Sequence, residues 1–257
     1  TNIATKGKSQ TINVYSSFVN DVYLPINESL LVRQIQLLSD LFFNPLVQDQ
    51  KFDEEIVKMK KKELKERLQV NKDDKFSYSL DKLFEYMGKN HTLGIPSTGY
   101  EDEIDTISSH DLYKYFLETI QNDEKHLYVV GDIDESIIDI LNQHLQFPEN
   151  NKDYPSAYSF DSQRQDVLEI IEEQDLTQSK LNMGYRIGCD FTSNHHYAFT
   201  VFNALFGGFS QSRLFKVVRE ENSLCYYVSS SYDAFNGIMI VNAGIEAKDY
   251  QKTMSLI

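Results

Sequence analysis

The sequence is poor in cysteine, in long apolar runs and in positive charge, and each shortage excludes a class of protein. Its two cysteines, Cys189 and Cys225, stand in no C-x-x-C spacing. We therefore predict no disulfide framework and expect a reducing, cytoplasmic compartment. No apolar run reaches the roughly 18 residues that suggest a membrane span, and no signal peptide is visible, so we expect no membrane partner.

The charge balance is strongly acidic. The 25 lysines and arginines face 39 aspartates and glutamates, which gives a formal net charge of −14. Phosphate would be repelled by such a chain, so nucleic acid is not an expected partner. The one basic run, residues 58–65, lies within a helical pattern and is interpreted as a solvated helix face.

The hydrophobic patterning indicates an α+β fold rather than a parallel βαβ repeat. Helical patterns cover 28–41, 52–70, 78–87, 108–117, 136–145 and 194–206, and a further helix follows Ser210 as its cap. Strand patterns cover 11–19, 127–131, 167–171, 180–187, 223–232 and 238–245. The last two form a predicted hairpin with a turn at Asn236 and Gly237.

Residues 148–161 are the best candidate for a linker. They hold prolines and asparagines with little apolar periodicity. We therefore predict one unit over residues 1–147 and a second over residues 162–257, and the 257 residues suffice for two ordinary domains.

The most informative stretch joins a Gly-Gly turn, an amphipathic helix and a strand. Gly207 and Gly208 form the turn, Arg219 lies at the end of the helix, and Tyr226 follows in the strand, seven residues after Arg219. Six pieces of the chain, taken in order, resemble the pitrilysin-type zinc peptidases, especially the smaller bacterial members related to mitochondrial processing peptidase and their inactive homologues. These pieces are 44–46, 52–55, 94–99, 107–112, 129–133 and 207–226.

The resemblance implies two related half-domains, each with a mainly antiparallel sheet and helices on one face. Residues 1–147 would be the remainder of the first half-domain, after its zinc-motif helix, and residues 162–257 the beginning of the second. In active members, an H-x-x-E-H helix supplies two zinc ligands and a general base, and a later glutamate is the third ligand. None of the six histidines here stands in that motif, which the family places upstream of Thr1.

The position of the third zinc ligand falls within this chain, on the helix after Phe52. The resemblance implies two glutamates seven residues apart on this helix, the second of which is the ligand. An ungapped match puts Lys60 and Arg67 at these two positions, and a shift of one residue puts Met59 and Glu66 there. A guanidinium cannot ligate zinc. We expect Arg67 to face inward, where it would pair with Glu63, although a surface pair on a charged helix is the simpler alternative.

Arg219 and Tyr226 match the family residues that hold a substrate's backbone carbonyl and steady the oxyanion. The alternative from residue types alone is an arginine near a helix end and a tyrosine packed on a sheet. Other candidate groups are interpreted as structural: His195 and His196 open a helix, and the Cys225 thiol is inert.

Three functions stay open. The first is a zinc-free homologue without cofactor that binds peptide or unfolded polypeptide, as a homodimer or as the heterodimeric partner of an active peptidase. The second is an active zinc endopeptidase with H-x-x-E-H upstream and Glu66 as third ligand. The third is a non-enzymatic peptide-binding or scaffold protein.

Overall fold

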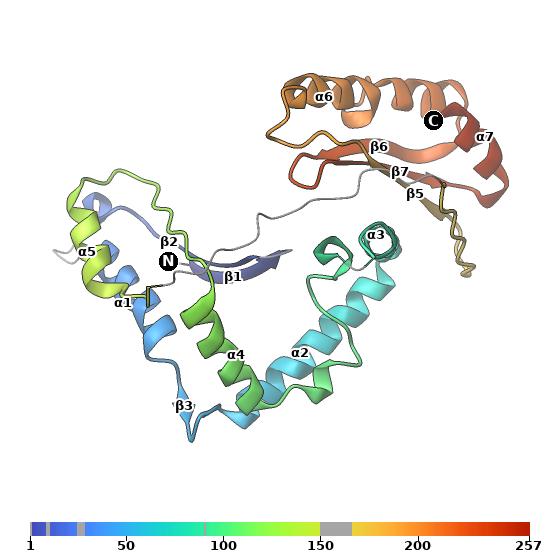
Figure 1. Ribbon diagram of the computed structural model, residues 1–257. Helices are drawn as coiled ribbons and strands as arrows, with labels where there is room; N and C mark the ends of the chain where they lie inside the picture. The colour runs from blue at the N-terminus through green and yellow to red at the C-terminus, as the bar shows by residue number, and fades with distance from the viewer. Residues whose placement is uncertain (1, 9–10, 25–28, 90, 150–165) are drawn as a thin grey trace. The chain divides into compact units, whose positions relative to one another are not determined.

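The computed structural model describes residues 2–8, 11–24, 29–89, 91–149 and 166–257, which form helices and antiparallel strands (Figure 1). The predicted α+β class is confirmed. The fold has two compact units, which we call unit 1 (Thr1–Leu68 and Ser97–Ser156) and unit 2 (Gln69–Pro96 and Ala157–Ile257). Residues 69–96 thus belong to unit 2, although the sequence analysis placed them in the first half-domain. Residues 150–161 of the expected linker lie outside the described residues, so the half-domain boundaries stay a prediction.

Unit 1 is built from helices and two short antiparallel strand pairs, β1 with β2 and β3 with β4. Its helices are α1 (Leu30–Phe43), α2 (Glu54–Asp73, which ends in unit 2), α4 (Ser109–Asn122) and α5 (Ser136–His144), with 3-10 turns η1 (Asp21–Tyr23) and η3 (Ile104–Thr106). Its strands are β1 (Asn2–Lys8), β2 (Thr11–Ser17), β3 (Val47–Gln48) and β4 (Lys51–Phe52). Ser108 caps α4 by accepting a hydrogen bond from the N–H of Asp111, as predicted.

Aromatic contacts hold the helices of unit 1 together. The rings of Phe42 and Phe43 on α1 lie 5.2 Å and 5.0 Å from the ring of Phe147, just beyond α5. The ring of Phe52 on β4 lies 5.5 Å from that of Tyr113 and 5.8 Å from that of Phe116 on α4. Tilted or edge-on rings at these separations are a favourable arrangement, so one cluster holds α1 to the segment after α5 and the other holds α4 to β4.

Unit 2 contains a three-stranded antiparallel sheet of order β5-β7-β6. Its strands are β5 (Ser179–Arg186), β6 (Cys225–Asp233) and β7 (Ile238–Ile245). Its helices are α3 (Lys75–Met87), α6 (His196–Asn203) and α7 (Tyr250–Leu256), the π-helical segments η4 (Ala204–Gly208) and η5 (Phe215–Glu221), and the 3-10 turns η2 (Thr92–Gly94) and η6 (Ala247–Asp249). The predicted β6–β7 hairpin is confirmed, and Gly237 supplies the positive φ of 60° at its turn.

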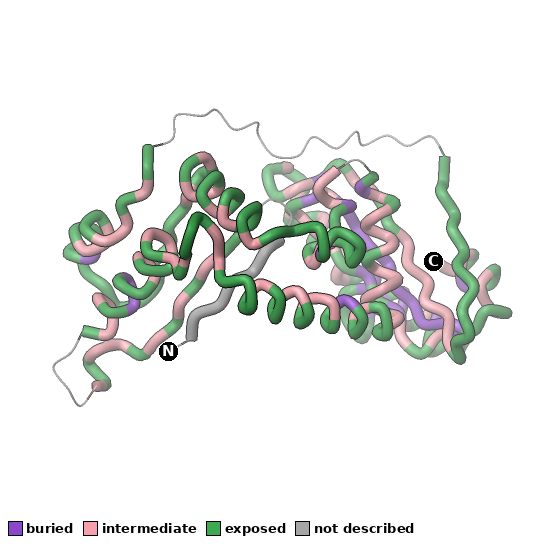
Figure 2. Tube along the Cα trace, turned by 90° about the horizontal axis from the view of Figure 1, so that it is seen from below, coloured by how far each residue is buried: buried purple, intermediate pink, exposed green. Residues whose placement is uncertain are grey.

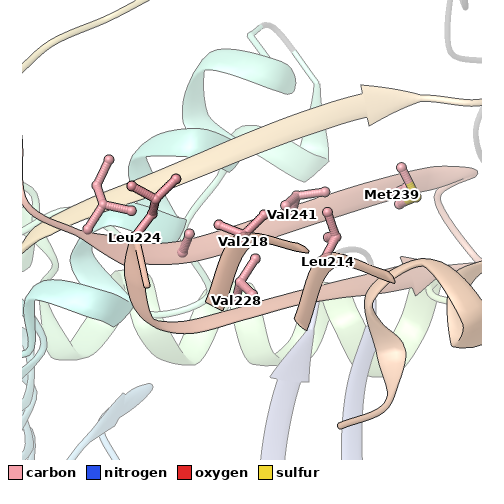
Figure 3. Packing of buried hydrophobic residues seen from close by; sticks show 8 residues of the cluster. Leu214, Val218, Leu224, Val228, Met239 and Val241 are labelled. Carbon is pink, nitrogen blue, oxygen red and sulfur yellow. The ribbon is translucent and has the colours of Figure 1, made fainter. Parts of the chain in front are cut away.

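The core of unit 2 lies between the sheet and the segment that carries η5. Every residue of β7 is buried (Figure 2). Leu214 and Val218 pack against Val228 and Val241 of the sheet (Figure 3). Helix α6 lies on the same side of the sheet as η5, and α3 lies on the opposite side (Figure 1). The layer formed by α3 was not anticipated from the sequence.

Polar groups fix α3 on its face of the sheet. The Asn242 side chain of β7 donates to the amide oxygen of Asn182 at 2.7 Å, and the Asn182 amide donates to the Ser79 hydroxyl at 2.8 Å. Asn242 is buried, so this chain satisfies groups that would otherwise be costly to remove from water.

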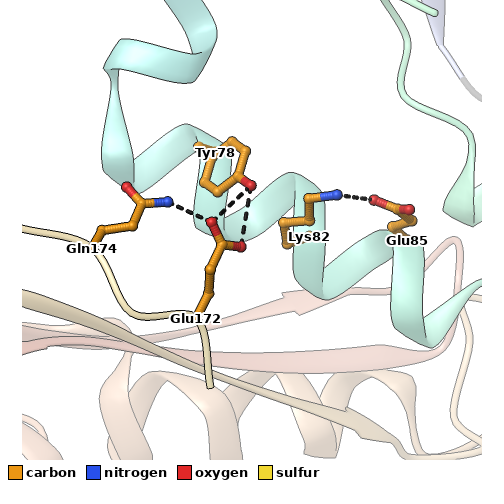
Figure 4. Close-up of polar contacts among 5 residues, drawn as sticks. All are labelled: Tyr78, Lys82, Glu85, Glu172 and Gln174. Carbon is orange, nitrogen blue, oxygen red and sulfur yellow. Dashed lines mark hydrogen bonds and ion pairs between the residues drawn. The ribbon is translucent and has the colours of Figure 1, made fainter. Parts of the chain in front are cut away.

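Two predicted strands are wrong. Residues 127–131 and 167–171 form no strand in the described chain, and Val130 and Val167 are 98% and 95% exposed. A strand needs a neighbour on the sheet, and apolar composition alone does not supply one. The 166–178 segment is instead tied to helices: Tyr78 of α3 donates to Glu172 at 3.1 Å (Figure 4), and Tyr250 of α7 donates to Glu169 at 2.6 Å.

One capping residue was also misplaced. The predicted Gly-Gly turn is also wrong, because Gly207 and Gly208 end the π-helical segment η4 and the turn follows them at residues 209–212. The next helical segment begins beyond Ser212, whose hydroxyl accepts from the N–H of Phe215 at 3.4 Å, so Ser212 rather than Ser210 is the cap. Both cysteines are free, as expected. Among the described residues, no helix combines the length and the apolar character that crossing a membrane requires.

Candidate functional site

Arg219 lies on the outer surface of η5, in unit 2. The buried residues Leu214 and Val218 anchor this segment to the core, which leaves Arg219 on the exposed side. Its guanidinium lies over the ring of Phe215, with 4.7 Å between its carbon and the ring centroid. This cation–π contact limits the movement of the side chain. It leaves the positive charge and the N–H donors of the guanidinium free to bind a ligand, because the ring face makes no hydrogen bond with them.

A tight connection joins η5 to the strand that carries Tyr226. The N–H of Ser223 donates to the carbonyl of Arg219 at 3.1 Å, and the N–H of Leu224 donates to the carbonyl of Val218 at 3.0 Å. Ser223 takes a positive φ of 53°, which reverses the chain direction within a single residue. These hydrogen bonds therefore fix the position of η5 relative to the start of β6.

Tyr226 lies at a bulge near the start of β6. The register of β6 against β7 shifts between Cys225 and Val228, and such a bulge redirects the side chains within it. Tyr226 is 80% exposed, so its hydroxyl is available to a ligand.

The positive charge of Arg219 affects the pKa of the Cys225 thiol, which belongs to the residue before Tyr226. Partial burial raises the pKa of Cys225 above its ordinary value of 9.0, and the positive charge of Arg219 opposes this rise. The guanidinium is thus close enough to act on the residue next to Tyr226. The raised pKa agrees with an unreactive thiol at Cys225.

The sequence analysis missed two features of this site. Phe215 supports Arg219, and the spacing of four residues between them on a helical segment was the available signal. The bulge at Tyr226 depends on pairing with β7, so no local pattern announces it.

The expected zinc-ligand positions lie in unit 1, on α2. Lys60 pairs with Glu63 at 2.8 Å, and Glu66 lies 3.8 Å from Lys62 with 66% of its side chain exposed. Arg67 is exposed, so its expected inward orientation is wrong, and the expected Glu63–Arg67 pair is replaced by the Lys60 pair. The more buried stripe of α2 is one residue further on, at Val57, Lys61, Leu64 and Leu68.

The described histidines, cysteines and carboxylates do not gather into a metal site. Across residues 2–8, 11–24, 29–89, 91–149 and 166–257, no three of them form a group that suits a metal ion. His196 opens α6 as expected, and its Nδ1 lies 3.2 Å from the Tyr232 hydroxyl, which donates to the Cys189 carbonyl. Zinc ligation through Glu66 therefore has no second or third ligand within the described chain.

The chain resembles known proteins over almost its whole length. The family described as "Peptidase M16 inactive domain" matches residues 106–257. The "Probable inactive metalloprotease YmfF" of Bacillus subtilis (strain 168) is 36% identical over 256 residues, which are 99% of this chain and 60% of that protein. The "Uncharacterized zinc protease YmxG" of the same organism is 25% identical over 87% of this chain and 53% of its own length.

Solved structures share the fold. A conserved protein from Enterococcus faecalis V583 superimposes with a TM-score of 0.90 at 30% identity, over 99% of this chain and 60% of that one. A peptidase M16 inactive domain from Pseudomonas fluorescens superimposes with a TM-score of 0.62 at 18% identity, over 87% of this chain and 53% of that one. This chain therefore spans little more than half the length of the proteins that it matches.

Proposed function

Because the chain belongs to the peptidase M16 family, as the sequence resemblance predicted, we propose that its protein binds peptides without hydrolysing them, as the non-catalytic partner of an active zinc peptidase. The observation that carries the proposal is the chemistry of α2. Arg67 is matched to the third zinc ligand and Lys60 to the family's other glutamate, and neither cation can bind zinc. Glu66, the carboxylate reached by a one-residue shift, is exposed beside Lys62.

Arg219 and Tyr226 would supply the peptide-holding contacts. A guanidinium and a phenol are both hydrogen-bond donors, and a peptide carbonyl accepts from each of them. The Phe215 ring limits the movement of the Arg219 side chain without using its N–H donors. Tyr226 is exposed, so its hydroxyl is also accessible to a peptide. Preorganised donors of this kind hold a carbonyl with little loss of side-chain entropy on binding.

The partner would be another chain of the same fold, in a heterodimer or a homodimer, and would bring the zinc site. The acidic charge of −14 argues against nucleic acid as the ligand. The two free cysteines suit a reducing compartment, so the proposed setting is the cytoplasm.

The test measures peptide binding and peptide hydrolysis by the protein in its full length. We expect a labelled, unstructured peptide to bind and to remain intact when zinc is added. Arg219→Ala should weaken binding by roughly tenfold or more, because a hydrogen bond from a charged group contributes about 1.5–3 kcal/mol. Tyr226→Phe should weaken it by roughly fivefold, because a neutral hydrogen bond contributes about 1 kcal/mol. Far-UV circular dichroism checks that both variants stay folded.

Matched controls separate the site from its surroundings. Arg213→Ala removes another exposed arginine from the start of the same helical segment, and Tyr197→Phe removes a hydroxyl from a tyrosine that is 81% exposed on α6. Both should leave binding unchanged. If none of the four substitutions weakens binding, Arg219 and Tyr226 do not hold the peptide and the protein is a scaffold. Zinc-dependent cleavage of the peptide by the purified protein would instead establish an active peptidase.

A further inference from the structure

Unit 1 contains a cleft of about 560 Å³ between α2 and the start of α4. The residues that line it come from one face of α2 and from the turn that precedes α4, segments that lie close together in Figure 1. They are Glu54, Val57, Lys58, Lys61, Lys62, Lys65, Asp105, Ile107, Ser108 and Ser109. The sequence analysis interpreted this lysine run as a solvated helix face and had no signal for the cleft, which depends on the packing of α4.

The lysines of the cleft form two rows along α2. Lys58 and Lys62 are four residues apart, and so are Lys61 and Lys65, so each pair is separated by about 6 Å along the helix axis. Alternate side chains of an extended peptide are about 6.6 Å apart and point to the same side. The lysine spacing therefore matches acidic residues at every second position of an extended peptide better than it matches one compact anion.

The positive charge of the cleft is only partly balanced. Lys65 pairs with Asp105 at 2.6 Å, and Lys61 donates to the Asp105 carbonyl at 3.2 Å. Lys62 has only a long contact of 3.8 Å with Glu66, and Lys58 forms no ion pair with a described residue. Glu54 is already paired with Lys51 at 2.5 Å. Two ammonium groups thus remain for a ligand, in a chain that is strongly acidic as a whole.

The other side of the cleft adds hydrogen-bond donors and an apolar wall. The first N–H groups of a helix have no partner within it, and in α4 the Ser108 hydroxyl accepts only from Asp111. The N–H groups of Ser109 and His110 therefore point out of the helix start, where anions are favoured. Val57 and Ile107 supply apolar surface for the body of a peptide.

From these contacts we infer that the cleft binds a short acidic peptide segment in extended form, with its carboxylates on Lys58 and Lys62. This site lies wholly in unit 1 and does not depend on Arg219 or Tyr226. Its failure and the failure of the proposed function are therefore distinguishable, because different variants test each of them.

The probe is a short labelled peptide of alternating glutamate and alanine, tested by fluorescence anisotropy against the full-length protein. The matched peptide with glutamine in place of glutamate should bind much more weakly. The double variant Lys58→Gln/Lys62→Gln should lose roughly thirtyfold in affinity for the acidic peptide, which corresponds to about 1 kcal/mol for each of the two charges at contact distance in water. The control Lys60→Gln/Lys114→Gln removes the same charge outside the cleft and should lose less than about twofold.

A gain of affinity is expected from the opposite change. Asp105→Asn frees Lys65 from its carboxylate partner and should tighten acidic-peptide binding by roughly threefold, which a variant that merely misfolds would not do. Equal losses in the two lysine double variants, or no binding to the parent protein, would overturn the inference. So would displacement of the peptide by millimolar inorganic phosphate, or tighter binding of a single-stranded oligonucleotide with the same sensitivity to Lys58 and Lys62.

Discussion

Replacing Gly207 with alanine tests how closely the end of η4 packs against the sheet. A Cβ at Gly207 would lie 2.6 Å from the Ser230 hydroxyl oxygen, 2.7 Å from the Ser230 backbone nitrogen and 2.8 Å from a methyl carbon of Leu214. The backbone nitrogen cannot retreat easily, because Ser230 of β6 pairs with Val241 of the central strand β7. Such overpacking costs about 1–3 kcal/mol, and the gain from replacing a helical glycine by alanine recovers at most about 1 kcal/mol. We therefore expect a net loss of about 1–2 kcal/mol.

Urea unfolding followed by circular dichroism measures this loss, and in a thermal melt the midpoint should fall by roughly 2–8 °C. Gly208→Ala is the matched neighbour: its Cβ would meet no atom closer than the Asn203 carbonyl oxygen, at 3.1 Å, so its loss should be smaller. A Gly207→Ala protein as stable as the parent, or no less stable than Gly208→Ala, would refute the close approach of the end of η4 to β6.

Two further predictions concern titrating groups. Asp74 caps α3, and hydrogen bonds from the Ser77 hydroxyl and N–H hold the pKa of its carboxyl below the ordinary 3.8. A lowered carboxyl pKa contributes stability above the unfolded value that is lost as the pH falls, so Asp74→Ala should destabilise the protein in urea at pH 7 and by less at pH 3. The charge of Arg219 opposes the rise in the pKa of Cys225, so Arg219→Ala should raise that pKa further. Alkylation of Cys225 by iodoacetamide, measured by mass spectrometry across a pH series, should then show its midpoint at higher pH. An unmoved midpoint would mean that the guanidinium does not lie near Cys225.

Elements with strong local signals were predictable from sequence. Ser108 begins α4, Gly88 follows α3, and Asn236 and Gly237 turn the β6–β7 hairpin, because each of these residues acts on its own backbone. Elements that depend on distant partners were not. The apolar residues 127–131 and 167–171 read as strands but have no neighbouring strand in the described chain.

The candidate site shows the same division. Arg219 and Tyr226 stand out by spacing and by family resemblance, and the structure adds that both are exposed on elements fixed by the core. The buried face of α2 was predicted one residue away from its observed position. The sequence of this helix allows more than one apolar stripe along its length, and the element that packs against it determines which stripe is buried. The lysine cleft depends on α4, which lies more than forty residues further along the chain, so α2 alone gave no sign of it.

The zinc content of the full-length protein tests the central claim most directly. The protein is purified, exposed to excess zinc, dialysed and analysed by mass spectrometry for metal, alongside Glu66→Ala. The account predicts that no zinc is retained in stoichiometric amount and that the two proteins do not differ, because Arg67 stands where the third ligand would be. One tightly held zinc per chain that is lost in Glu66→Ala would contradict it.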